Sequence, residues 1–239
     1  MTWWASLSGG LGTRRLGRTT LAALAGLLLP TLPAAAKVIT HLPTTDKVVA
    51  LTFDACESRT PAFLDHGISD FLVGHKIPFT IFVSGRFARH NGADLAALGK
   101  LDFVELENHS MNHFNHMERL SDQAIRQELT QADTALFQAS GRHSRYFRFP
   151  AGNDDARSLA VVEGAGYKVV HWSFASGDPG RSVTPAHLTE WVLLKTRPGD
   201  ILIFHINGRG WSTARALPGI VAALEKRGYR FTRLDRMLP

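Results

Sequence analysis

The chain has 239 residues, of which 44% are hydrophobic and 20% charged, with 27 Lys and Arg against 21 Asp and Glu. This composition is typical of a globular protein and excludes a disordered or fibrous chain. The single cysteine, Cys56, excludes an internal disulfide framework and any zinc site built from several cysteines. Three of the positive charges lie in the first 36 residues, so the remainder carries a net charge of only +3 and gives no indication of nucleic-acid binding.

Residues 1–36 have the features of a secretory signal peptide. Three arginines precede an apolar run at 21–29, and three alanines at 34–36 follow it. This order predicts export and cleavage after Ala36, although an uncleaved membrane anchor shares the pattern. The run is too short to cross a hydrocarbon layer of about 30 Å as a helix. We therefore expect residues 37–239 to be one mature domain, secreted or periplasmic, monomeric and without stable membrane insertion.

Seven apolar runs, rich in β-branched and aromatic residues, predict strands along the mature chain. They are residues 47–53, 77–83, 102–107, 146–149, 167–172, 200–205 and 229–234. Several are almost continuously apolar, which is typical of parallel strands that are buried on both faces.

Helical patterns lie between these runs and carry start signals. Thr60-Pro61 and Thr184-Pro185 each offer an N-cap residue followed by a proline, and Ser121 precedes a periodic pattern that ends at Gly141. The other helical patterns are residues 93–98, 156–164 and 213–227. Strands that alternate with helices predict an α/β fold, and seven strands predict a closed or nearly closed (β/α) barrel in a single domain.

Polar side chains follow the ends of the predicted strands. They are Asp54, His109, His113, Arg148, Asp178 and His205. In a (β/α) barrel the carboxyl ends of all strands open on one face, where active sites form. The sequence therefore predicts that these side chains share one mouth.

His109 and His113 have the i, i+4 spacing of a helical turn, which would let both imidazoles bind one metal ion. Ser110 stands where the helix of a zinc protease has its glutamate, so the base of that chemistry is missing. A His-rich surface turn explains the spacing equally well. His116 lies further along the chain and is left out of the predicted site.

The remaining polar residues each allow a structural and a functional interpretation. Asp54 is a site carboxylate or an N-cap, and Cys56 is a metal ligand, a nucleophile or, as favoured here, a small buried structural residue. Arg148 forms a surface ion pair or holds a carboxylate ionised. Asp178 lies in a turn sequence, and His205 is a structural residue or, beside a carboxylate, a proton donor near neutral pH.

Five motifs, in this order, resemble those of the polysaccharide deacetylases, carbohydrate esterase family 4, which share the NodB homology region. They are Thr52-Phe53-Asp54, His109-Ser-x-x-His113, Arg148-x-Pro150-x-Gly152, Trp172 followed by Asp178, and Ile203-Phe204-His205. The resemblance covers roughly residues 48–234. It implies a distorted (β/α)7 barrel, in agreement with the strand count, and metal-dependent removal of acetyl groups, usually from N-acetylglucosamine units of chitin-like chains or peptidoglycan.

The resemblance assigns the proton-transfer roles. It implies that Asp54 is the general base, that Arg148 positions and ionises it, that His205 is the general acid, and that Asp178 tunes His205. This division suits amide hydrolysis, because a carboxylate accepts a proton from the attacking water and a separate acid protonates the departing amine.

The resemblance also implies a metal site and a substrate surface. His109 and His113 would bind one divalent ion, zinc or else cobalt. Ile203, Pro150 and Trp172 are the implied substrate-binding residues, and Ile203 would line the acetyl pocket in the place usually held by leucine.

Two positions depart from the family pattern. Ala55 replaces a second aspartate that is normally the third metal ligand, and alanine cannot ligate a metal. The metal must then be held by the two histidines with water, or by Asp54, Glu57 or Cys56 as well. Pro179 stands where the family often has tryptophan, so part of the substrate wall is expected to be missing.

Three hypotheses of function follow. The leading one is a metal-dependent hydrolase of amide bonds, a deacetylase of N-acetylated glycans of the chitooligosaccharide or peptidoglycan type. O-deacetylation of acetylated xylan is a variant of this hypothesis, because ester and amide hydrolysis would use the same site residues. The rival hypothesis is a non-catalytic glycan-binding protein on the same barrel, and the replacement at Ala55 is the feature that suggests it. The joint presence of base, acid, arginine and both histidines favours the enzyme.

Overall fold

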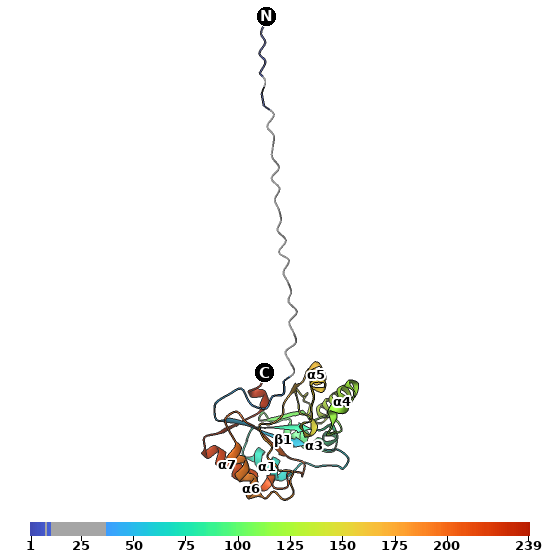
Figure 1. The fold of residues 1–239 in the computed structure, drawn as a ribbon, viewed down its shortest axis with the longest axis vertical. Coiled ribbons are helices and arrows are strands. Elements are labelled where there is room, and N and C mark those ends of the chain that lie inside the picture. The colour runs from blue at the N-terminus through green and yellow to red at the C-terminus, as the bar shows by residue number, and fades with distance from the viewer. Residues whose placement is uncertain (8, 11–36) are drawn as a thin grey trace. The chain divides into compact units, whose positions relative to one another are not determined.

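The computed structural model describes residues 1–7, 9–10 and 37–239, and the barrel belongs to one compact unit, Ala35–Pro239 (Figure 1). The described residues before position 11 are exposed and without regular secondary structure. The predicted apolar run at 21–29 and the alanines at 34–36 lie outside the described residues. Among the described residues, no helix has the length and apolar character needed to span a bilayer.

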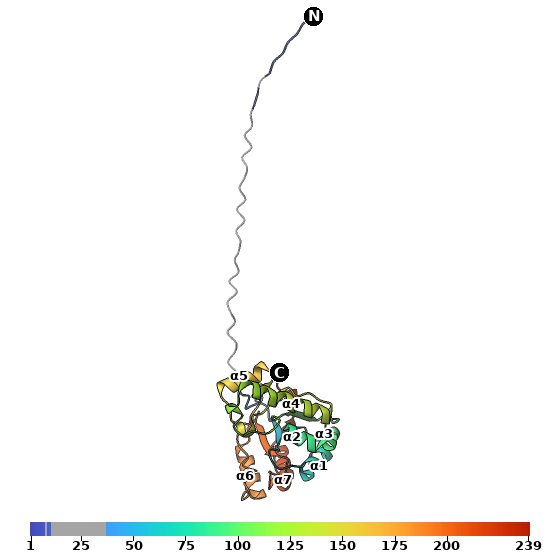
Figure 2. The ribbon, with the colours of Figure 1, turned by 90° about the vertical axis from the view of Figure 1, so that its right-hand side faces the viewer.

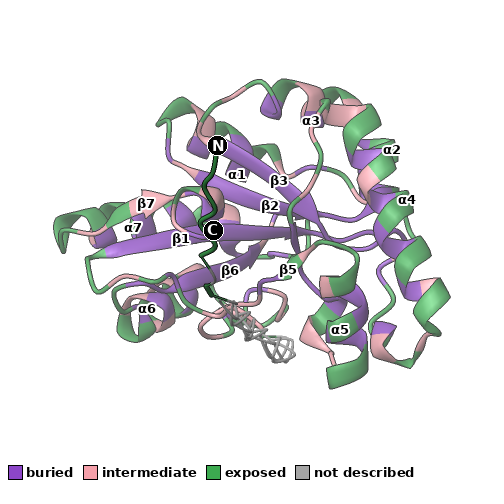
Figure 3. Ribbon diagram, turned by 90° about the horizontal axis from the view of Figure 1, so that it is seen from above, coloured by how far each residue is buried: buried purple, intermediate pink, exposed green. Residues whose placement is uncertain are grey.

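One sheet of seven parallel strands forms the centre of the compact unit. The strands are β1 (Val48–Ala55), β2 (Phe79–Val83), β3 (Val104–Asn108), β4 (Tyr146–Phe147), β5 (Lys168–Val169), β6 (Ile201–His205) and β7 (Arg230–Thr232). Each overlaps one predicted run. Their order is β5-β4-β3-β2-β1-β6, and β7 pairs with the first residues of β1. Figure 3 shows the long strands as buried ribbons running side by side through the unit.

The sheet curls into a barrel whose ladder is interrupted between β5 and β6. Within the described chain, isolated bridges reinforce this region: Phe174 with Leu202, Ile39 with Val170, and His41 with Asp200. Ile39 and His41 therefore pair with residues at both edges of the gap. The predicted fold, a distorted (β/α)7 barrel in a single domain, is confirmed.

Helices cover the outside of the sheet (Figures 1 and 2). They are α1 (His66–Gly74), α2 (Gly85–His90), α3 (Gly92–Leu98), α4 (Asp122–Ser140), α5 (Ala156–Gly164), α6 (Pro185–Lys195) and α7 (Thr213–Lys226). Helix α4 packs against α2, α3 and α5, whereas α7 packs against α1 and α6. In Figure 2, α4 and α5 accordingly lie at one end of the unit, and α6 and α7 lie at the other.

Two helix starts follow the predicted caps. At the start of α4, Ser121 Oγ accepts a hydrogen bond from the Ala124 N–H, and Gly141 ends the helix with φ of 72°. Thr184 caps α6 in the same way. In both cases a side-chain oxygen satisfies a backbone donor that has no partner within the helix.

The helix start predicted at Thr60-Pro61 is wrong, because α1 begins at His66 with Asp65 as its N-cap. The preceding segment is a loop that the Asn91 side chain holds. Asn91 Oδ1 accepts from the Leu64 N–H at 3.0 Å, and Nδ2 donates to the Ala62 carbonyl at 2.9 Å. These contacts occupy backbone groups that a helix beginning at residue 61 would use itself.

Residues of β1 alternate between the two sides of the sheet, as the pleat of a strand requires. Val49 and Leu51 pack into the core beneath the helices, whereas Val48 and Ala50 belong to the core of the barrel interior. The same alternation assigns Asp54 to the interior row. The strand therefore carries a carboxylate to the carboxyl-terminal mouth of the barrel.

Candidate active site

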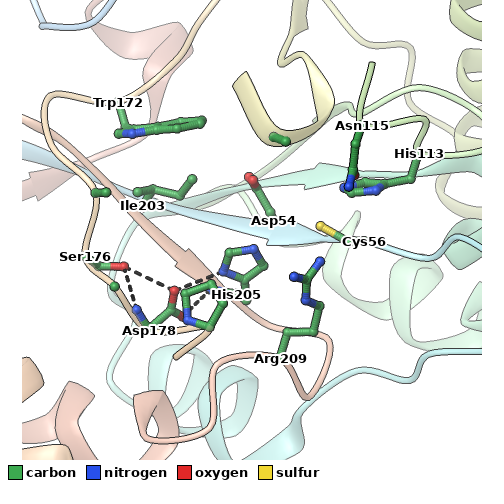
Figure 4. A pocket seen from close by; sticks show the side chains of 14 residues that line it. Asp54, Cys56, His113, Asn115, Trp172, Ser176, Asp178, Ile203, His205 and Arg209 are labelled. Atoms are coloured by element: carbon green, nitrogen blue, oxygen red, sulfur yellow. Dashed lines mark hydrogen bonds and ion pairs between the residues drawn. The ribbon is translucent and has the colours of Figure 1, made fainter. Parts of the chain in front are cut away.

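A pocket opens at the carboxyl ends of the strands (Figure 4). Strands β1 and β6 and the segments that follow β1, β3, β4, β5 and β6 contribute its walls. The lining side chains that bear on its chemistry are Asp54, Cys56, His113, Trp172, Ile203 and His205. The structure thus brings polar residues from distant segments of the chain to one place.

Asp54 and Arg148 form a buried ion pair beside this pocket. Arg148 Nη1 donates to Asp54 Oδ1 at 2.7 Å, and the arginine side chain is fully buried. Its other N–H groups donate to Thr52 Oγ1 and to the carbonyls of Val170 and His171. The guanidinium is therefore fixed by β1 and by the end of β5, and it is not the surface ion pair that the sequence also allowed.

The Asp54 carboxylate is held in its ionised form. Burial raises the pKa of Asp54, but the charges of Arg148, His109 and His205, with the hydrogen bond from Arg148, outweigh burial and leave the pKa below its usual range. The second oxygen, Oδ2, lies 3.6 Å from His109 Nε2. Asp54 thus offers an ionised oxygen that Arg148 does not occupy.

His205 is the partner of Asp54 in the register of β1 with β6. Its Nδ1 lies 2.9 Å from Asp178 Oδ1, and its backbone N–H donates to Asp178 Oδ2 at 2.7 Å. Asp178 is fully buried and also accepts from Thr213 Oγ1 and Ser176 Oγ. Asp178 therefore lies in a turn, as its sequence indicates, and at the same time orients His205 (Figure 4).

This contact favours the protonated imidazole of His205. Burial lowers the pKa of His205, but the hydrogen bond to Asp178 and the hydrogen bond and charge of Cys56 outweigh burial and raise the pKa to about 10. A cationic imidazole and an ionised carboxylate consequently stand on neighbouring strands at the mouth of the barrel.

The helical turn predicted for residues 109–113 is wrong. The segment is a loop after β3, in which Ser110 and His113 have φ of 65° and 53°. The Ser110 hydroxyl accepts from the His113 N–H at 3.1 Å. The imidazoles of His109 and His113 still meet, with ring centroids 4.9 Å apart. Left-handed backbone at non-glycine residues is uncommon and often marks functional loops.

His109 has one ring nitrogen engaged and the other unpaired. Nδ1 lies 2.8 Å from the Arg148 carbonyl, so this nitrogen must carry a hydrogen to bond it. Nε2 is buried and, within the described part of the chain, has no hydrogen-bond partner. His116, which the sequence left out of the site, is instead exposed and paired with Glu118.

Cys56 lies next to the two histidines. Its Sγ and one ring nitrogen each of His109 and His113 lie within 4.8 Å of one another, and all three residues are buried. Burial raises the pKa of the Cys56 thiol, but the charges of His113 and His109 outweigh burial and hold the pKa well below its usual value. Ala55 is fully buried in the apolar core and has no donor atom. Thiolate and imidazole are ligand types that zinc prefers, so the residues present fit a divalent cation.

The predicted substrate-binding residues divide into two groups. Trp172 and Ile203 line the pocket, whereas Pro150 is buried in a short 3-10 turn, Pro150–Gly152, and Ala151 lines the pocket in its place. The tight turn directs adjacent residues to different sides, so Pro150 supports the wall without forming it. Gly152 has φ of 70°, and a Cβ at this position would lie 2.7 Å from the Trp172 ring.

Sequence reasoning missed three polar residues of the pocket. Asn115, Ser176 and Arg209 all contribute to the lining. Their position in the sequence could have predicted them, because each lies in a loop after a strand whose carboxyl end was already expected at the open face of the barrel. Arg209 in particular follows His205 in a polar, glycine-containing segment.

Residues 41–170 match the family model described as polysaccharide deacetylase. The chain belongs to the polysaccharide deacetylase family. The matched segment carries Asp54, both histidines of the predicted metal site and Arg148, while His205 and Asp178 lie beyond it.

Individual relatives of this polysaccharide deacetylase span most of the chain. It is 27% identical over 201 residues to a peptidoglycan-N-acetylglucosamine deacetylase of Bacillus cereus, covering 83% of this chain and 91% of that protein. It is 31% identical over 160 residues to a chitooligosaccharide deacetylase of Sinorhizobium fredii, covering 66% of this chain and 71% of that protein. The structure of a CE4 family pseudoenzyme from Bacillus anthracis superimposes with a TM-score of 0.75 at 23% identity, covering 86% of this chain and 70% of that one. This last similarity concerns the fold alone.

These comparisons confirm the predicted family and the predicted enzyme class, a hydrolase that removes acetyl groups from polysaccharides. Deacetylases of this family depend on a metal ion, and the cluster of Cys56, His109 and His113 provides a possible site for one.

Proposed function

We propose that this polysaccharide deacetylase is an N-deacetylase that hydrolyses the acetamido group of N-acetylglucosamine units in a glycan. The observation that supports it most directly is the pairing of Asp54, ionised beside Arg148, with His205, protonated beside Asp178, at one pocket. Amide hydrolysis needs both a proton acceptor and a proton donor, since water must lose a proton and the amine must gain one.

Asp54 acts as the general base. Arg148 occupies Oδ1 and leaves Oδ2 to accept the proton of the attacking water. The low pKa keeps the carboxylate ready at neutral pH. Arg148 makes three further contacts to the protein, so it also fixes the direction in which the carboxylate faces.

His205 acts as the general acid. Asp178 binds Nδ1, which leaves Nε2 as the nitrogen that can donate a proton to the departing amine. The backbone N–H of His205 also binds Asp178, so the carboxylate positions both the ring and the strand end that carries it. Asp178 is in this sense a positioning residue.

His109 and His113 would hold a divalent cation, which we propose to be zinc, with cobalt able to replace it. The unpaired, buried Nε2 of His109 is the atom that a cation would satisfy. When bound, such an ion supplies a Lewis acid that polarises the acetyl carbonyl.

Trp172 and Ile203 form the apolar side of the site and receive the acetyl methyl group and the sugar. Ile203 is 7% exposed at the pocket wall, and Thr52 is its partner in the register of β1 with β6. An indole presents a flat apolar face that can pack against a pyranose ring. Pro179 also lines the pocket, so the wall near Asp178 is closed by a smaller side chain than tryptophan.

Positive charge around the pocket favours a glycan that carries carboxylates. Arg209 lines the pocket itself, Arg181 and Arg209 line a hollow beside it, and Arg59 and Arg86 line a second hollow. All four arginines are exposed, and His113 lies at the edge of all three depressions. Arginine binds carboxylates with paired hydrogen bonds. Peptidoglycan carries carboxylates and chitin does not, so we place a peptidoglycan-type substrate first and chitooligosaccharides second.

The enzyme would meet such a glycan outside the cytoplasm. We propose that residues 1–36 are a signal peptide and that residues 37–239 are the mature deacetylase, a secreted or periplasmic monomer. The support is the sequence pattern of charge, apolar run and small residues at the predicted cleavage site.

The test is acetate release by purified residues 37–239 from peptidoglycan, N-acetylated chitooligosaccharides and acetylated xylan, each with zinc, cobalt or chelator. We expect metal-dependent release from the first two, fastest from peptidoglycan, and Arg209→Ala should lower the rate on peptidoglycan more than on neutral chitooligosaccharides. Release from acetylated xylan alone would make the protein an O-deacetylase. No release from any substrate in the presence of bound metal would favour a non-catalytic glycan-binding protein.

A further inference from the structure

Resting on the proposed function, we propose that Cys56 is the third protein ligand of the metal and that its thiolate replaces the carboxylate lost at Ala55. The site would then be His109, His113 and Cys56. Such a ligand set differs from the two histidines and one aspartate that the family resemblance implies.

The geometry of the three donors supports this assignment. In a tetrahedral zinc site, with bonds of about 2.1 Å to nitrogen and 2.3 Å to sulfur, ligand atoms lie about 3.5 Å apart. The Cys56 Sγ and the nitrogens of His109 and His113 already lie within 4.8 Å of one another. Small side-chain movements toward a common centre therefore suffice.

The unpaired nitrogen of His109 is an independent indication of a ligand. Its Nδ1 is committed to the Arg148 carbonyl, which fixes the tautomer and leaves a lone pair on Nε2 in the neutral ring. Nε2 is buried and, among the described residues, has no hydrogen-bond partner. Buried polar nitrogens are rarely left in this state, and a cation held with Cys56 would satisfy it.

The other candidates for the third ligand are engaged elsewhere. Glu57 lies 2.7 Å from His90 Nδ1 and accepts from the Ala62 N–H at 3.0 Å. Asp54 Oδ1 is held by Arg148, and the proposed function uses the free oxygen, Oδ2, as the base. Ala55 has no donor atom. Of the residues next to Ala55 in the chain, Cys56 is the one whose donor atom lies with both histidines.

Charge leads to the same assignment. Two neutral imidazoles contribute no charge, so a site without an anionic ligand leaves both charges of the cation uncompensated. A thiolate restores the single negative charge that an aspartate would have supplied. The thiol proton is released to solvent as the metal–sulfur bond forms, so the step involves no oxidation. Thiolate is also a soft ligand, which favours zinc or cobalt over magnesium or calcium.

The first test is spectroscopic. Residues 37–239 are loaded with cobalt, and the near-ultraviolet thiolate-to-cobalt charge-transfer band is recorded for wild type, Cys56→Ser and the control His116→Ala. We expect the band in wild type and in the control and its loss in Cys56→Ser. Zinc affinity of Cys56→Ser should fall at least about 100-fold, the upper end of what loss of a supporting residue around a metal site costs. A wild-type cobalt complex without this band would overturn the proposal.

The second test needs no variant, because Cys56 is the single cysteine of the chain. Alkylation of the wild-type thiol by iodoacetamide is timed with and without one equivalent of zinc. Cys56 is buried but lines the pocket, which gives a small reagent a route to its thiol. We expect zinc to slow alkylation strongly, and an unchanged rate with zinc bound would exclude Cys56 as a ligand.

The results of these tests distinguish a wrong ligand assignment from a wrong proposed function. A protein that binds cobalt through sulfur but releases no acetate retains the ligand assignment and loses the deacetylase mechanism. A protein that releases acetate with no charge-transfer band and no protection of Cys56 retains the activity and loses the thiolate ligand.

Discussion

Asp178 binds His205 at two points, the ring Nδ1 at 2.9 Å and the backbone N–H at 2.7 Å, using a different carboxylate oxygen for each. One buried side chain thus orients the imidazole and ties it to the end of β6. The hydrogen bond to Asp178 is the largest of the interactions that raise the pKa of His205, ahead of those of Cys56.

Replacing Asp178 should shift the alkaline limb of the pH profile. His205 must be protonated to act as acid, so activity falls as pH rises through its pKa, which is raised to about 10. In Asp178→Asn the anionic partner is lost, and the limb of kcat/KM should move down by about one to three pH units. The measurement is acetate release from pH 6 to about 11. A lower rate with an unmoved limb would show that Asp178 does not set the pKa of His205.

Asp54→Asn should abolish most activity with little change in fold. Loss of a general base costs about 10²–10⁴-fold in rate. The amide has the shape of the carboxylate, and its oxygen can still accept from Arg148, so the circular dichroism spectrum should match wild type. Asp70→Asn, at an exposed carboxylate of α1, is the matched control and should keep full activity. Activity in Asp54→Asn close to that of the control would remove Asp54 from the mechanism.

His205→Ala should lower the rate by a similar factor, about 10²–10⁴-fold, because the departing amine then lacks its acid. Substrates with a better leaving group, such as an aryl ester, should be affected much less, since they need no protonation. Equal losses on the amide and the ester would assign His205 a structural role.

Metal binding should weaken as pH falls. His109 and His113 ligate only as neutral imidazoles, so protons compete with the ion. Chelator should abolish acetate release, and zinc or cobalt should restore it. Isothermal titration of zinc across a pH range from neutral to acidic checks the dependence, because a protonated imidazole has no lone pair for a metal. Affinity that does not change across it would exclude imidazole ligands.

Gly152→Ala should damage the substrate wall. The residue has φ of 70°, where a side chain costs about 1–2 kcal/mol, and the added methyl group would lie 2.7 Å from the Trp172 ring. The melting temperature should fall and KM should rise as the indole is displaced. Gly164→Ala, on α5 with open space around the new methyl group, is the control. Unchanged KM would remove Trp172 from the substrate wall.

The strands and the mouth residues were readable from the sequence for a physical reason. Buried parallel strands are continuously apolar, and a polar residue such as Asp54 or His205 at the end of one stands out. The barrel then implies that these ends converge. No comparable regularity marks α2, which has six residues and too little length to show a helical period.

Other features depend on contacts that a linear pattern does not contain. The loop at residues 109–113 keeps the two imidazoles together through positive φ at Ser110 and His113, where spacing alone favoured a helical turn. The start of α1 was displaced by the side chain of Asn91, from a distant segment. The position of Cys56 beside both histidines is likewise a property of the folded chain.

Strand β1 has three hydrogen-bonded neighbours, β2 and β6 along its carboxyl-terminal half and β7 at its beginning. Opening β1 therefore requires breaking pairings on both of its edges, so its amides should exchange with solvent only in the global unfolding reaction. Among the residues that the structure describes, the loop after His205 has no such pairing beyond its first residues. Native-state hydrogen exchange should accordingly show slow exchange up to Asp54 and fast exchange around Arg209. The general base would then sit in the most persistent part of the protein, while the rim that meets the glycan remains free to adjust.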